Sequence, residues 1–263
     1  MTDRQRFITD CRSIRDLSPL ILNITNYVAM NYTAGALLAV GASPLMSFCP
    51  EEMEELTAGA DALVVNIGCM DKVQAEAMRI AVDTAARCAK PWILDPAGVG
   101  SSMVRIALCR ELIGLYAPAV IRGNASEICC LAQGRPSGRG VDATLEGREV
   151  LESAKALATT TGSVISMSGE TDYITDGIST LTIHNGHSLM PKVTAMGCTA
   201  SALTGAFAAV ENDMEAAAAN AMALMGLCGE NAAKASNGPG TFAAAFIDAL
   251  HNFDAETEIE RII

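Results

Sequence analysis

A glycine–cysteine pair, Gly197 and Cys198, lies near the start of an uncharged stretch that runs from Val193 to Val210. If a helix begins at this pair, its first turn presents unpaired N–H groups and the positive end of the helix dipole, and both attract anions. We expect the pKa of the Cys198 thiol to fall at such a terminus, so that a partly ionised sulfur can accept the proton of a bound hydroxyl. The alternative is a small buried cysteine in a tightly packed helix.

An aspartate, Asp95, stands in a Leu-Asp-Pro segment, and the glycine-containing residues 97–102 follow it. The proline ends the expected strand, and the glycines leave room for a ligand. A carboxylate at this point could hold a divalent cation, most naturally Mg²⁺, which binds oxygen ligands and keeps several of its waters. The alternative is a turn aspartate that caps the next helix.

The segment Ile-Arg-Gly-Asn-Ala-Ser-Glu-Ile at 121–128 offers three further polar side chains, those of Arg122, Asn124 and Glu127. The Arg122 guanidinium is suited to phosphate oxygens, and Glu127, on the first turn of the following helix, could share a cation with Asp95. Two alternatives stay open. Asn124 and Glu127 have the spacing of a capping box, and Arg122 could form a salt bridge at the edge of the sheet.

Apolar patterning predicts the elements that position these residues. Buried strands are expected at residues 20–25, 62–68, 92–96, 119–124 and 163–169, and amphipathic helices at 71–90 and 145–162, the second closed by Gly162. This alternation predicts an α/β fold with a mostly parallel sheet and helices on both faces. Because ligands of such sheets bind beyond the carboxyl ends of the strands, the polar clusters that follow these strands are expected to line one site.

Residues 171–187 predict a β-hairpin added to the sheet, and the alanine-rich residues from Cys198 to about Phe253 predict helices. No proline-, serine- or charge-rich linker divides the chain, so we expect a single domain over 1–263. The sequence contains neither the GxxxxGK[ST] pattern nor the GxSxG pattern. A P-loop for nucleotide phosphates and the nucleophile turn of a serine hydrolase are therefore excluded.

The composition excludes several classes of protein. The chain has 263 residues, of which 50% are hydrophobic, and its formal net charge of −12 is offset by no basic cluster, so nucleic-acid binding is not expected. The charged N-terminal segment lacks the apolar core of a signal peptide, and residues 193–210 are too rich in alanine, glycine and hydroxyl side chains to span a membrane. Nine scattered cysteines are expected to be free thiols in a reducing compartment, the cytoplasm.

Seven segments together resemble the hydroxyethylthiazole kinases, a family of the ribokinase-like superfamily, over nearly the whole chain. They are NITNYVAMNYTAGALLAVGASPLM (23–46), NIG (66–68), LDPAGVGSS (94–102), IRGNASEI (121–128), GRGVDAT (138–144), MSGETDYITDG (167–177) and VTAMGCTASALTGAF (193–207). The resemblance implies a ribokinase-like three-layer sandwich. It also implies phosphorylation of the primary alcohol of 4-methyl-5-(2-hydroxyethyl)thiazole in thiamine synthesis or salvage, with ATP and Mg²⁺, by a homotrimer that binds the thiazole near its subunit interfaces.

The resemblance also implies which residues contact the thiazole. Met46 matches a thiazole-contacting methionine, and Asn26, Val28 and Gly68 are expected close to it. Ala195 corresponds to a backbone position that contacts the substrate. The usual Gly-Thr-Gly-Cys of the family appears here as Ala-Met-Gly-Cys, so a residue with a side chain replaces glycine at position 195.

For the nucleotide, the resemblance implies that Arg122 and Ser168 contact ATP, and we add Asn124 and Gly197 as candidates. Asp95 and Glu127 match an acidic pair near the metal. Cys198 falls where the superfamily usually places a catalytic aspartate, and the family is similar in having cysteine there.

Two rival functions stay open. The same architecture serves hydroxymethylpyrimidine kinases and nucleotide-repair dehydratases, and a catalytically silent thiazole-binding protein would share the pocket. The combination of Asp95, Arg122, Glu127 and the Gly197–Cys198 pair favours an enzyme.

Overall fold

A computed structural model describes residues 3–136 and 147–258 of the chain. Its strands form one sheet of eight in the order β2-β1-β3-β4-β5-β6-β7-β8, in which the first six strands are parallel, β7 is antiparallel to β6, and β8 is antiparallel to β7. The strands are β1 (Leu20–Ile24), β2 (Ser43–Met46), β3 (Ala62–Asn66), β4 (Trp92–Asp95), β5 (Val120–Asn124), β6 (Val164–Ser168), β7 (Asp172–Thr175) and β8 (Thr180–Ile183).

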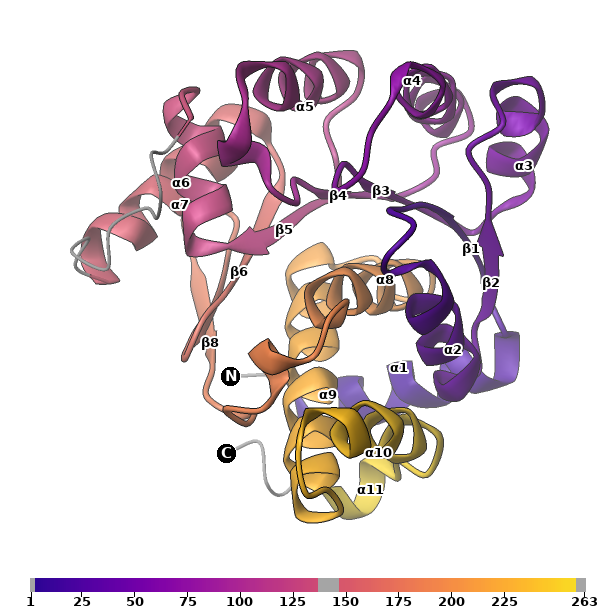
Figure 1. The fold of residues 1–263 in the computed structure, drawn as a ribbon, viewed down its shortest axis with the longest axis vertical. Coiled ribbons are helices and arrows are strands. Elements are labelled where there is room, and N and C mark those ends of the chain that lie inside the picture. The colour runs from indigo at the N-terminus through magenta and orange to yellow at the C-terminus, as the bar shows by residue number, and fades with distance from the viewer. Residues whose placement is uncertain (1–2, 137–146, 259–263) are drawn as a thin grey trace.

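Helices cover both faces of this sheet (Figure 1). One face carries α3 (Met53–Gly59), α4 (Lys72–Arg87), α5 (Met103–Leu115), α6 (Ala125–Gln133) and α7 (Gly147–Thr161). The other carries α1 (Arg4–Leu17), α2 (Met30–Val40), α8 (Met196–Ala208), α9 (Met214–Lys234) and α10 (Pro239–His251). A short α11 (Ala255–Glu258) and the 3₁₀ turns η1 (Pro50–Glu52), η2 (Val99–Ser101) and η3 (Met190–Lys192) complete the described elements. The predicted α/β sandwich is confirmed.

The expected strands correspond to β1, β3, β4, β5 and β6, and the expected hairpin to β7 and β8. The first expected helix is α4, which begins where the Asp71 carboxylate accepts a hydrogen bond from the Gln74 N–H at 2.8 Å. The second is α7, and Gly162 closes it with a left-handed φ of 71°. The segment GRGVDAT at 138–144 lies outside the described residues.

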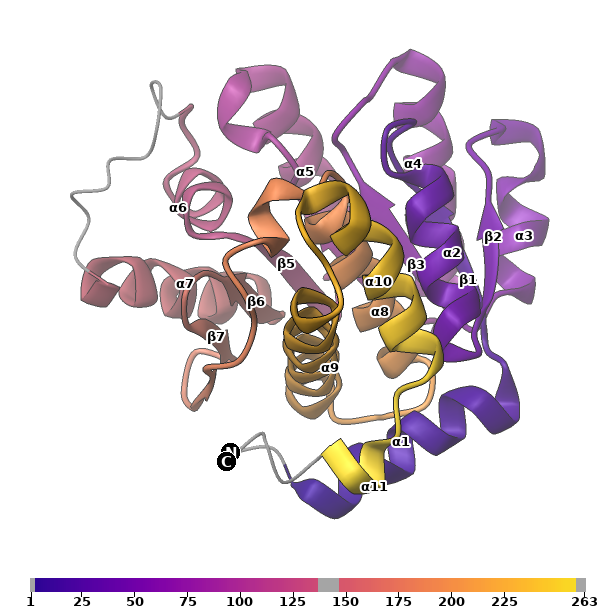
Figure 2. The same cartoon turned by 60° about the horizontal axis from the view of Figure 1, so that its bottom comes forward.

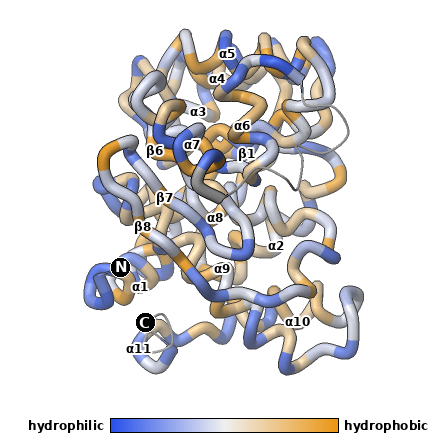
Figure 3. Tube along the Cα trace, turned by 90° about the vertical axis from the view of Figure 1, so that its left-hand side faces the viewer, coloured by the Kyte–Doolittle hydropathy of each residue, from blue (hydrophilic) through white to orange (hydrophobic). Residues whose placement is uncertain are grey.

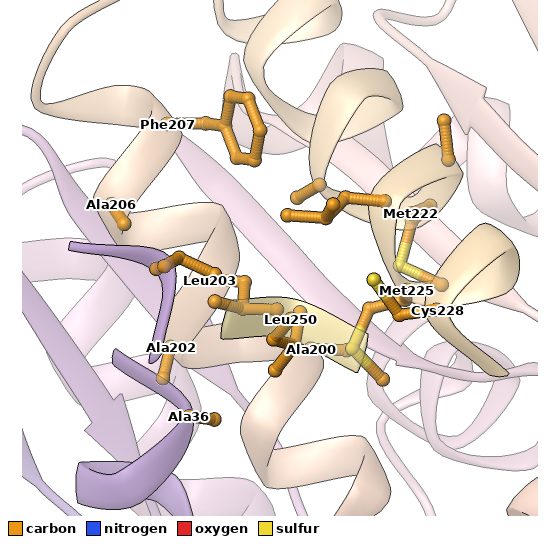
Figure 4. Close-up of a cluster of buried hydrophobic side chains, with 14 of the residues drawn as sticks. Ala36, Ala200, Ala202, Leu203, Ala206, Phe207, Met222, Met225, Cys228 and Leu250 are labelled. Atoms are coloured by element: carbon orange, nitrogen blue, oxygen red, sulfur yellow. The ribbon is translucent and has the colours of Figure 1, made fainter. Parts of the chain in front are cut away.

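Helix α8 lies directly on the sheet because its contact face is made of small residues. A Cβ at Gly205 would lie 2.6 Å from Val64 Cγ2 of β3 and 3.3 Å from Ile21 Cγ2 of β1. On its other side, Leu203 and Ala200 belong to the same buried cluster as Met222 and Met225 of α9, which is drawn in Figure 4. The uncharged stretch is thus a buried core helix, as its composition predicts.

The N-terminal helix α1 closes this face of the molecule. Phe7 stacks on Phe207 of α8 with ring centroids 6.4 Å apart, and it meets Phe253 edge-on at 6.0 Å. Figure 2 shows α11 beside α1, where Arg12 and Glu256 form an ion pair. Figure 3 shows hydrophilic stretches of both helices at the periphery. Within residues 3–136 and 147–258, no helix has the length and apolar character required to cross a membrane.

The fit of α8 on the sheet can be tested with Gly205→Ala. We expect a loss of about 1–3 kcal/mol in the free energy of unfolding, because the added methyl group would overlap the side chain of Val64. The matched control is Gly35→Ala in α2, where a new Cβ meets nothing within 4 Å. It should be neutral or stabilise by up to about 1 kcal/mol. Urea unfolding measures both, and equal stabilities would contradict the close packing of α8.

Candidate active site

The candidate site lies where the carboxyl ends of β3, β4, β5 and β6 meet the first turn of α8. Asn66, Asp95, Asn124 and Ser168 are the last residues of these four strands, and Asn66 pairs with Asp95 across β3 and β4. The parallel register brings strand ends that are far apart in sequence to one edge of the sheet (Figure 1). This is the edge at which open α/β sheets bind ligands.

Asp95 is buried, with 2% of its surface exposed, between the sheet and α8. Its Oδ2 atom accepts hydrogen bonds from Asn66 Nδ2 at 2.6 Å and from Ser201 Oγ at 2.7 Å. Burial raises the pKa of Asp95 to about 6, and the negative charge of Glu127 adds to this, whereas Arg122 and the two hydrogen bonds act in the opposite direction. The side chain is thus a desolvated carboxylate, not the cap of the following helix: Ser102 caps α5, accepting from the Arg105 N–H at 3.4 Å.

Arg122 joins β5 to β6 and to α8. Its guanidinium donates to Ser168 Oγ at 2.6 Å and to the carbonyl oxygen of Gly197 at 3.1 Å. Among the described residues its buried Nε has no hydrogen-bond partner, and no carboxylate forms a salt bridge with it. The structure therefore brings Arg122, Ser168 and Gly197 together, and it leaves the guanidinium with capacity for an anion.

Glu127 and Asn124 form the capping box that the sequence offered as an alternative. Asn124 Oδ1 accepts from the Glu127 N–H at 2.9 Å, and Glu127 Oε2 accepts from the Asn124 N–H at 2.9 Å. The second carboxylate oxygen, Oε1, accepts from the Gly98 N–H of the loop after β4, also at 2.9 Å. Glu127 thus links α6 to the loop that follows Asp95, and its charge acts on Asp95 from there.

Cys198 lies in the first turn of α8, as expected, but the expected fall of its pKa is wrong. Burial raises the pKa of the thiol to about 11, and the negative charge of Asp95 adds to the increase. Hydrogen bonds from Asn26 and Asn66 and the charge of Arg122 lower it, but not by enough to compensate. The sulfur is therefore a protonated thiol at neutral pH, because loss of solvent and the charge of Asp95 dominate.

The terminus itself has the form expected of an anion site. Ala195, the residue before the helix, adopts a left-handed φ of 74°, which is unusual for a residue with a side chain. Within the part of the chain that the structure describes, no side chain caps this end of α8. The N–H groups of the first turn are thus left for water or a ligand.

The residues expected at the thiazole divide into two groups. Asn26 is buried beside Cys198, with Nδ2 at 3.2 Å from Sγ, and Gly68 donates its N–H to Asn66 Oδ1 at 2.9 Å, so both belong to the network around the sulfur. Met46 ends β2, two strands from β3, and Val28 is 66% exposed in the turn after β1. Among the described contacts, neither of these two forms a hydrogen bond with the network.

The sequence alone does not identify Asn66, Ser201 or Arg105 as residues of the site. Asn66 belongs to the Asn-Ile-Gly segment, and Ser201 stands four residues after Gly197, on the same face of α8, but neither type of side chain carries a strong signal. Arg105 of α5 donates to the carbonyl oxygens of Ile67 at 2.6 Å, Gly68 at 2.9 Å and Ala97 at 2.9 Å. It thereby holds the loops after β3 and β4 together.

The carboxylates of Asp95 and Glu127 suit a divalent cation that a phosphate ligand would also bind. Glu127 raises the pKa of Asp95 by its charge, which indicates that the two carboxylates are close enough to interact unfavourably when both are ionised. A divalent cation would relieve this repulsion. Among the described residues no group of three or more His, Cys, Asp or Glu side chains could hold a metal alone, and Mg²⁺ commonly takes its remaining ligands from water and phosphate.

Comparisons with known proteins give a family and a fold. The model of the family described as "Hydroxyethylthiazole kinase family" matches residues 11–256. A hydroxyethylthiazole kinase of Leptospira biflexa is 46% identical over 250 residues, which are 95% of this chain and 94% of the relative. One of Brachyspira hyodysenteriae is 46% identical over 261 residues, 99% of this chain and 98% of the relative.

Solved structures give the same fold. A hydroxyethylthiazole kinase protein from Pyrococcus horikoshii superposes with a TM-score of 0.87 at 35% identity, covering 95% of this chain and 94% of that one. A pyridoxal kinase from Staphylococcus aureus, in complex with AMP-PCP and pyridoxal, has a TM-score of 0.61 at 15% identity, covering 81% and 88% of the two chains. The second likeness concerns the fold alone.

The burial of Asp95 predicts an effect of pH on the metal-free protein. The pKa is raised from its usual 3.8 to about 6 in the folded state, so the folded protein binds this proton more tightly than the unfolded chain does. The contribution of Asp95 to stability is therefore highest below about pH 4 and falls as the pH rises to about 6. At pH 7 in EDTA, Asp95→Asn should be more stable than the unsubstituted protein by roughly 1–3 kcal/mol, and the difference should vanish near pH 4.

Asp176→Asn is the control of opposite sign. The pKa of Asp176 is lowered, mainly by hydrogen bonds from the N–H groups of Ile178 and Ser179, so its replacement should destabilise the protein at pH 7. Urea unfolding at a series of pH values measures both variants. An Asp95→Asn variant that is less stable than the unsubstituted protein at pH 7 would show that Asp95 is not strained by burial.

Proposed function

Because the chain belongs to the hydroxyethylthiazole kinase family, we propose that it transfers the terminal phosphoryl group of ATP to the primary alcohol of 4-methyl-5-(2-hydroxyethyl)thiazole. The observation that carries this proposal is the convergence of Arg122, Asp95 and Cys198 on the uncapped start of α8. At the start of α8, Arg122 would donate to phosphate, Asp95 would bind the cation and Cys198 would contact the alcohol.

Phosphoryl transfer proceeds through a loose transition state, so that catalysis consists mainly of positioning and of stabilising negative charge. Arg122, with its buried Nε free of a protein partner in the described residues, supplies charge to the phosphoryl oxygens. The first-turn N–H groups of α8 add donors beside it. Ser168 holds the guanidinium in place, and Asn124, exposed at the end of β5, lies where a nucleotide can reach it.

Asp95 and Glu127 would hold Mg²⁺ together with the phosphates. When bound, the cation would neutralise the negative charge on the phosphate oxygens. The chain contributes the position of the two carboxylates: Asn66 and Ser201 fix Asp95, and the capping box and Gly98 fix Glu127.

Cys198 would contact the hydroxyl of the alcohol through its sulfur. In a loose transition state the alcohol keeps its proton until late, so the acceptor need not be a strong base. Only the thiolate, a small fraction of Cys198 at neutral pH, can take this proton. It accepts a hydrogen bond from the hydroxyl, directs the oxygen lone pair toward the phosphorus, and becomes the neutral thiol as the new P–O bond forms and the bond to ADP breaks. The thiazole ring would lie toward Asn26, Gly68, Met46 and Val28, with the Ala195 backbone beside it.

We also propose that the chain acts as a homotrimer in the cytoplasm, in thiamine synthesis or salvage. Exposed apolar side chains at the thiazole end, such as Tyr27 at 57% and Val28 at 66%, suit burial against a neighbouring protomer. All nine cysteines are free thiols, which is typical of a reducing compartment.

A coupled assay of ADP release tests the reaction itself. With ATP and Mg²⁺, we expect the thiazole alcohol to be phosphorylated at a kcat/KM at least about 10²-fold above that for hydroxymethylpyrimidine or pyridoxal, a difference of about 3 kcal/mol in transition-state binding. Calorimetry with the thiazole alcohol is run in parallel. Binding without ADP release would mean a catalytically silent protein, and preferential turnover of the pyrimidine would mean a different kinase of the same fold.

The role of Cys198 is tested by Cys198→Ala. We expect kcat to fall by about 10²-fold, near the lower end of the range for positioned acid–base groups, because the raised pKa makes the thiolate scarce. Cys130→Ala, which removes a buried thiol from α6, should leave kcat unchanged. A loss of less than about tenfold for Cys198→Ala would remove the sulfur from the mechanism.

A further inference from the structure

Asn66 lies between two residues to which the proposed function gives different tasks. It is 1% exposed at the carboxyl end of β3. Its Nδ2 donates to Asp95 Oδ2 of β4 at 2.6 Å and to Cys198 Sγ of α8 at 3.3 Å. A single amide nitrogen therefore connects the acid assigned to the cation with the sulfur assigned to the alcohol.

The hydrogen bonds of this amide fix its orientation. An asparagine side chain has two N–H donors and an oxygen with two acceptor sites. Both donors of Asn66 are used on Asp95 and Cys198, and its Oδ1 accepts from Asn26 Nδ2 at 3.0 Å and from the Gly68 N–H at 2.9 Å. A flipped amide would turn its oxygen toward a carboxylate and its nitrogen toward two donors, so the network permits one orientation.

Asn26 extends the same arrangement to the other side of the sulfur. Its Nδ2 donates to Cys198 Sγ at 3.2 Å and to Asn66 Oδ1, and its Oδ1 accepts from the Ala29 N–H at 3.0 Å. The sulfur thus receives two amide donors, one from the loop after β1 and one from β3. Two donors from different elements define its position better than the helix backbone does alone.

Gly68 is required for this close packing. A Cβ at this position would lie 2.9 Å from Asn66 Oδ1 and 3.0 Å from Asn26 Nδ2. Neither amide can move away freely, because each is held by hydrogen bonds at both of its polar atoms. A side chain at position 68 would therefore displace the donors of the sulfur.

We propose that Asn66 is a positioning residue of the phosphoryl transfer, which sets the sulfur of Cys198 relative to the carboxylate of Asp95. This inference rests on the proposed function. Asn66 need not touch the alcohol or ATP for this role: it acts through Asp95, which is assigned to the cation, and Cys198, which is assigned to the alcohol. Ser201 assists on the α8 side by donating to the same Asp95 oxygen at 2.7 Å, but it has no hydrogen bond to the sulfur among the described contacts.

The first test is Asn66→Ala, assayed by ADP release with the thiazole alcohol. We expect kcat to fall by about 10–100-fold, as for other residues that orient reacting groups, with a change of less than about threefold in the KM for ATP. Asn220→Ala is the matched control. Asn220 is an equally buried asparagine whose Nδ2 donates to the Asp10 carboxylate at 2.7 Å, but in α9 and against α1.

Thermal unfolding separates positioning from loss of stability. Asn66→Ala and Asn220→Ala each remove an amide donor from a buried carboxylate, so we expect similar decreases in Tm, and the loss of kcat in Asn66→Ala alone. An Asn66→Ala protein that is folded at the assay temperature and retains kcat within about threefold would overturn the proposal.

The second test is a double-mutant cycle with Cys198→Ala. If Asn66 acts through the sulfur, the factor by which Asn66→Ala lowers kcat should shrink at least about threefold when Cys198 is absent. Part of the effect should persist, since Asp95 is still displaced. Equal factors in the two backgrounds would contradict a role through Cys198.

Gly68→Ala repeats the cycle without removing a hydrogen-bonding group. We expect it to lower kcat in the unsubstituted protein by about tenfold or more, and by a smaller factor in Cys198→Ala, whereas Gly35→Ala lowers it in neither. Failure of the proposed function is distinguishable: the unsubstituted protein would then not phosphorylate the thiazole alcohol. An active protein with additive substitutions would overturn only the role of Asn66.

Discussion

The site depends on a buried carboxylate that accepts hydrogen bonds from the two layers on either side of it, the sheet and α8. Asp95 receives one hydrogen bond from Asn66 of β3 and one from Ser201 of α8, at 2.6 and 2.7 Å. An ionised group so deep in the molecule is tolerated only when its oxygens are satisfied, and removal of one donor leaves a large desolvation penalty. These two bonds therefore also determine where the first turn of α8 lies above the strand ends, and with it Gly197 and Cys198.

Small side chains allow α8 to come close enough for these bonds to form. Gly205, one helical turn beyond Ser201, leaves no room for a Cβ against Val64 and Ile21, and aromatic residues make up only 4% of the chain. A helix held further from the sheet by larger residues could not place a short serine side chain on Asp95. The packing that gives the protein its core and the geometry that gives it a site are thus set by the same contact.

The sequence predicts most of this arrangement, and its failures have physical reasons. Five parallel strands are short and mostly buried runs rich in apolar residues, but β2 has four half-buried residues, including Pro44, and no such pattern. At the site, Asp95, Arg122 and Glu127 are conspicuous because charged residues rarely follow buried strands without a function or a partner. Asn66 and Ser201 carry no comparable signal. Their importance follows from register, which pairs Asn66 with Asp95, and register is a property of the folded sheet.

The pKa of Cys198 shows why residue type and position are insufficient for electrostatics. A helix terminus stabilises a neighbouring anion by about 1 kcal/mol, which is less than one pKa unit. The thiol pKa nevertheless rises from 9.0 to about 11, since burial and the Asp95 charge outweigh the two amide donors and the charge of Arg122 together. The same exclusion of water strengthens the interaction of Arg122 with a phosphoryl group. A loose transition state tolerates an acceptor of which only a small fraction is ionised, because the alcohol loses its proton late and the position of the sulfur matters most.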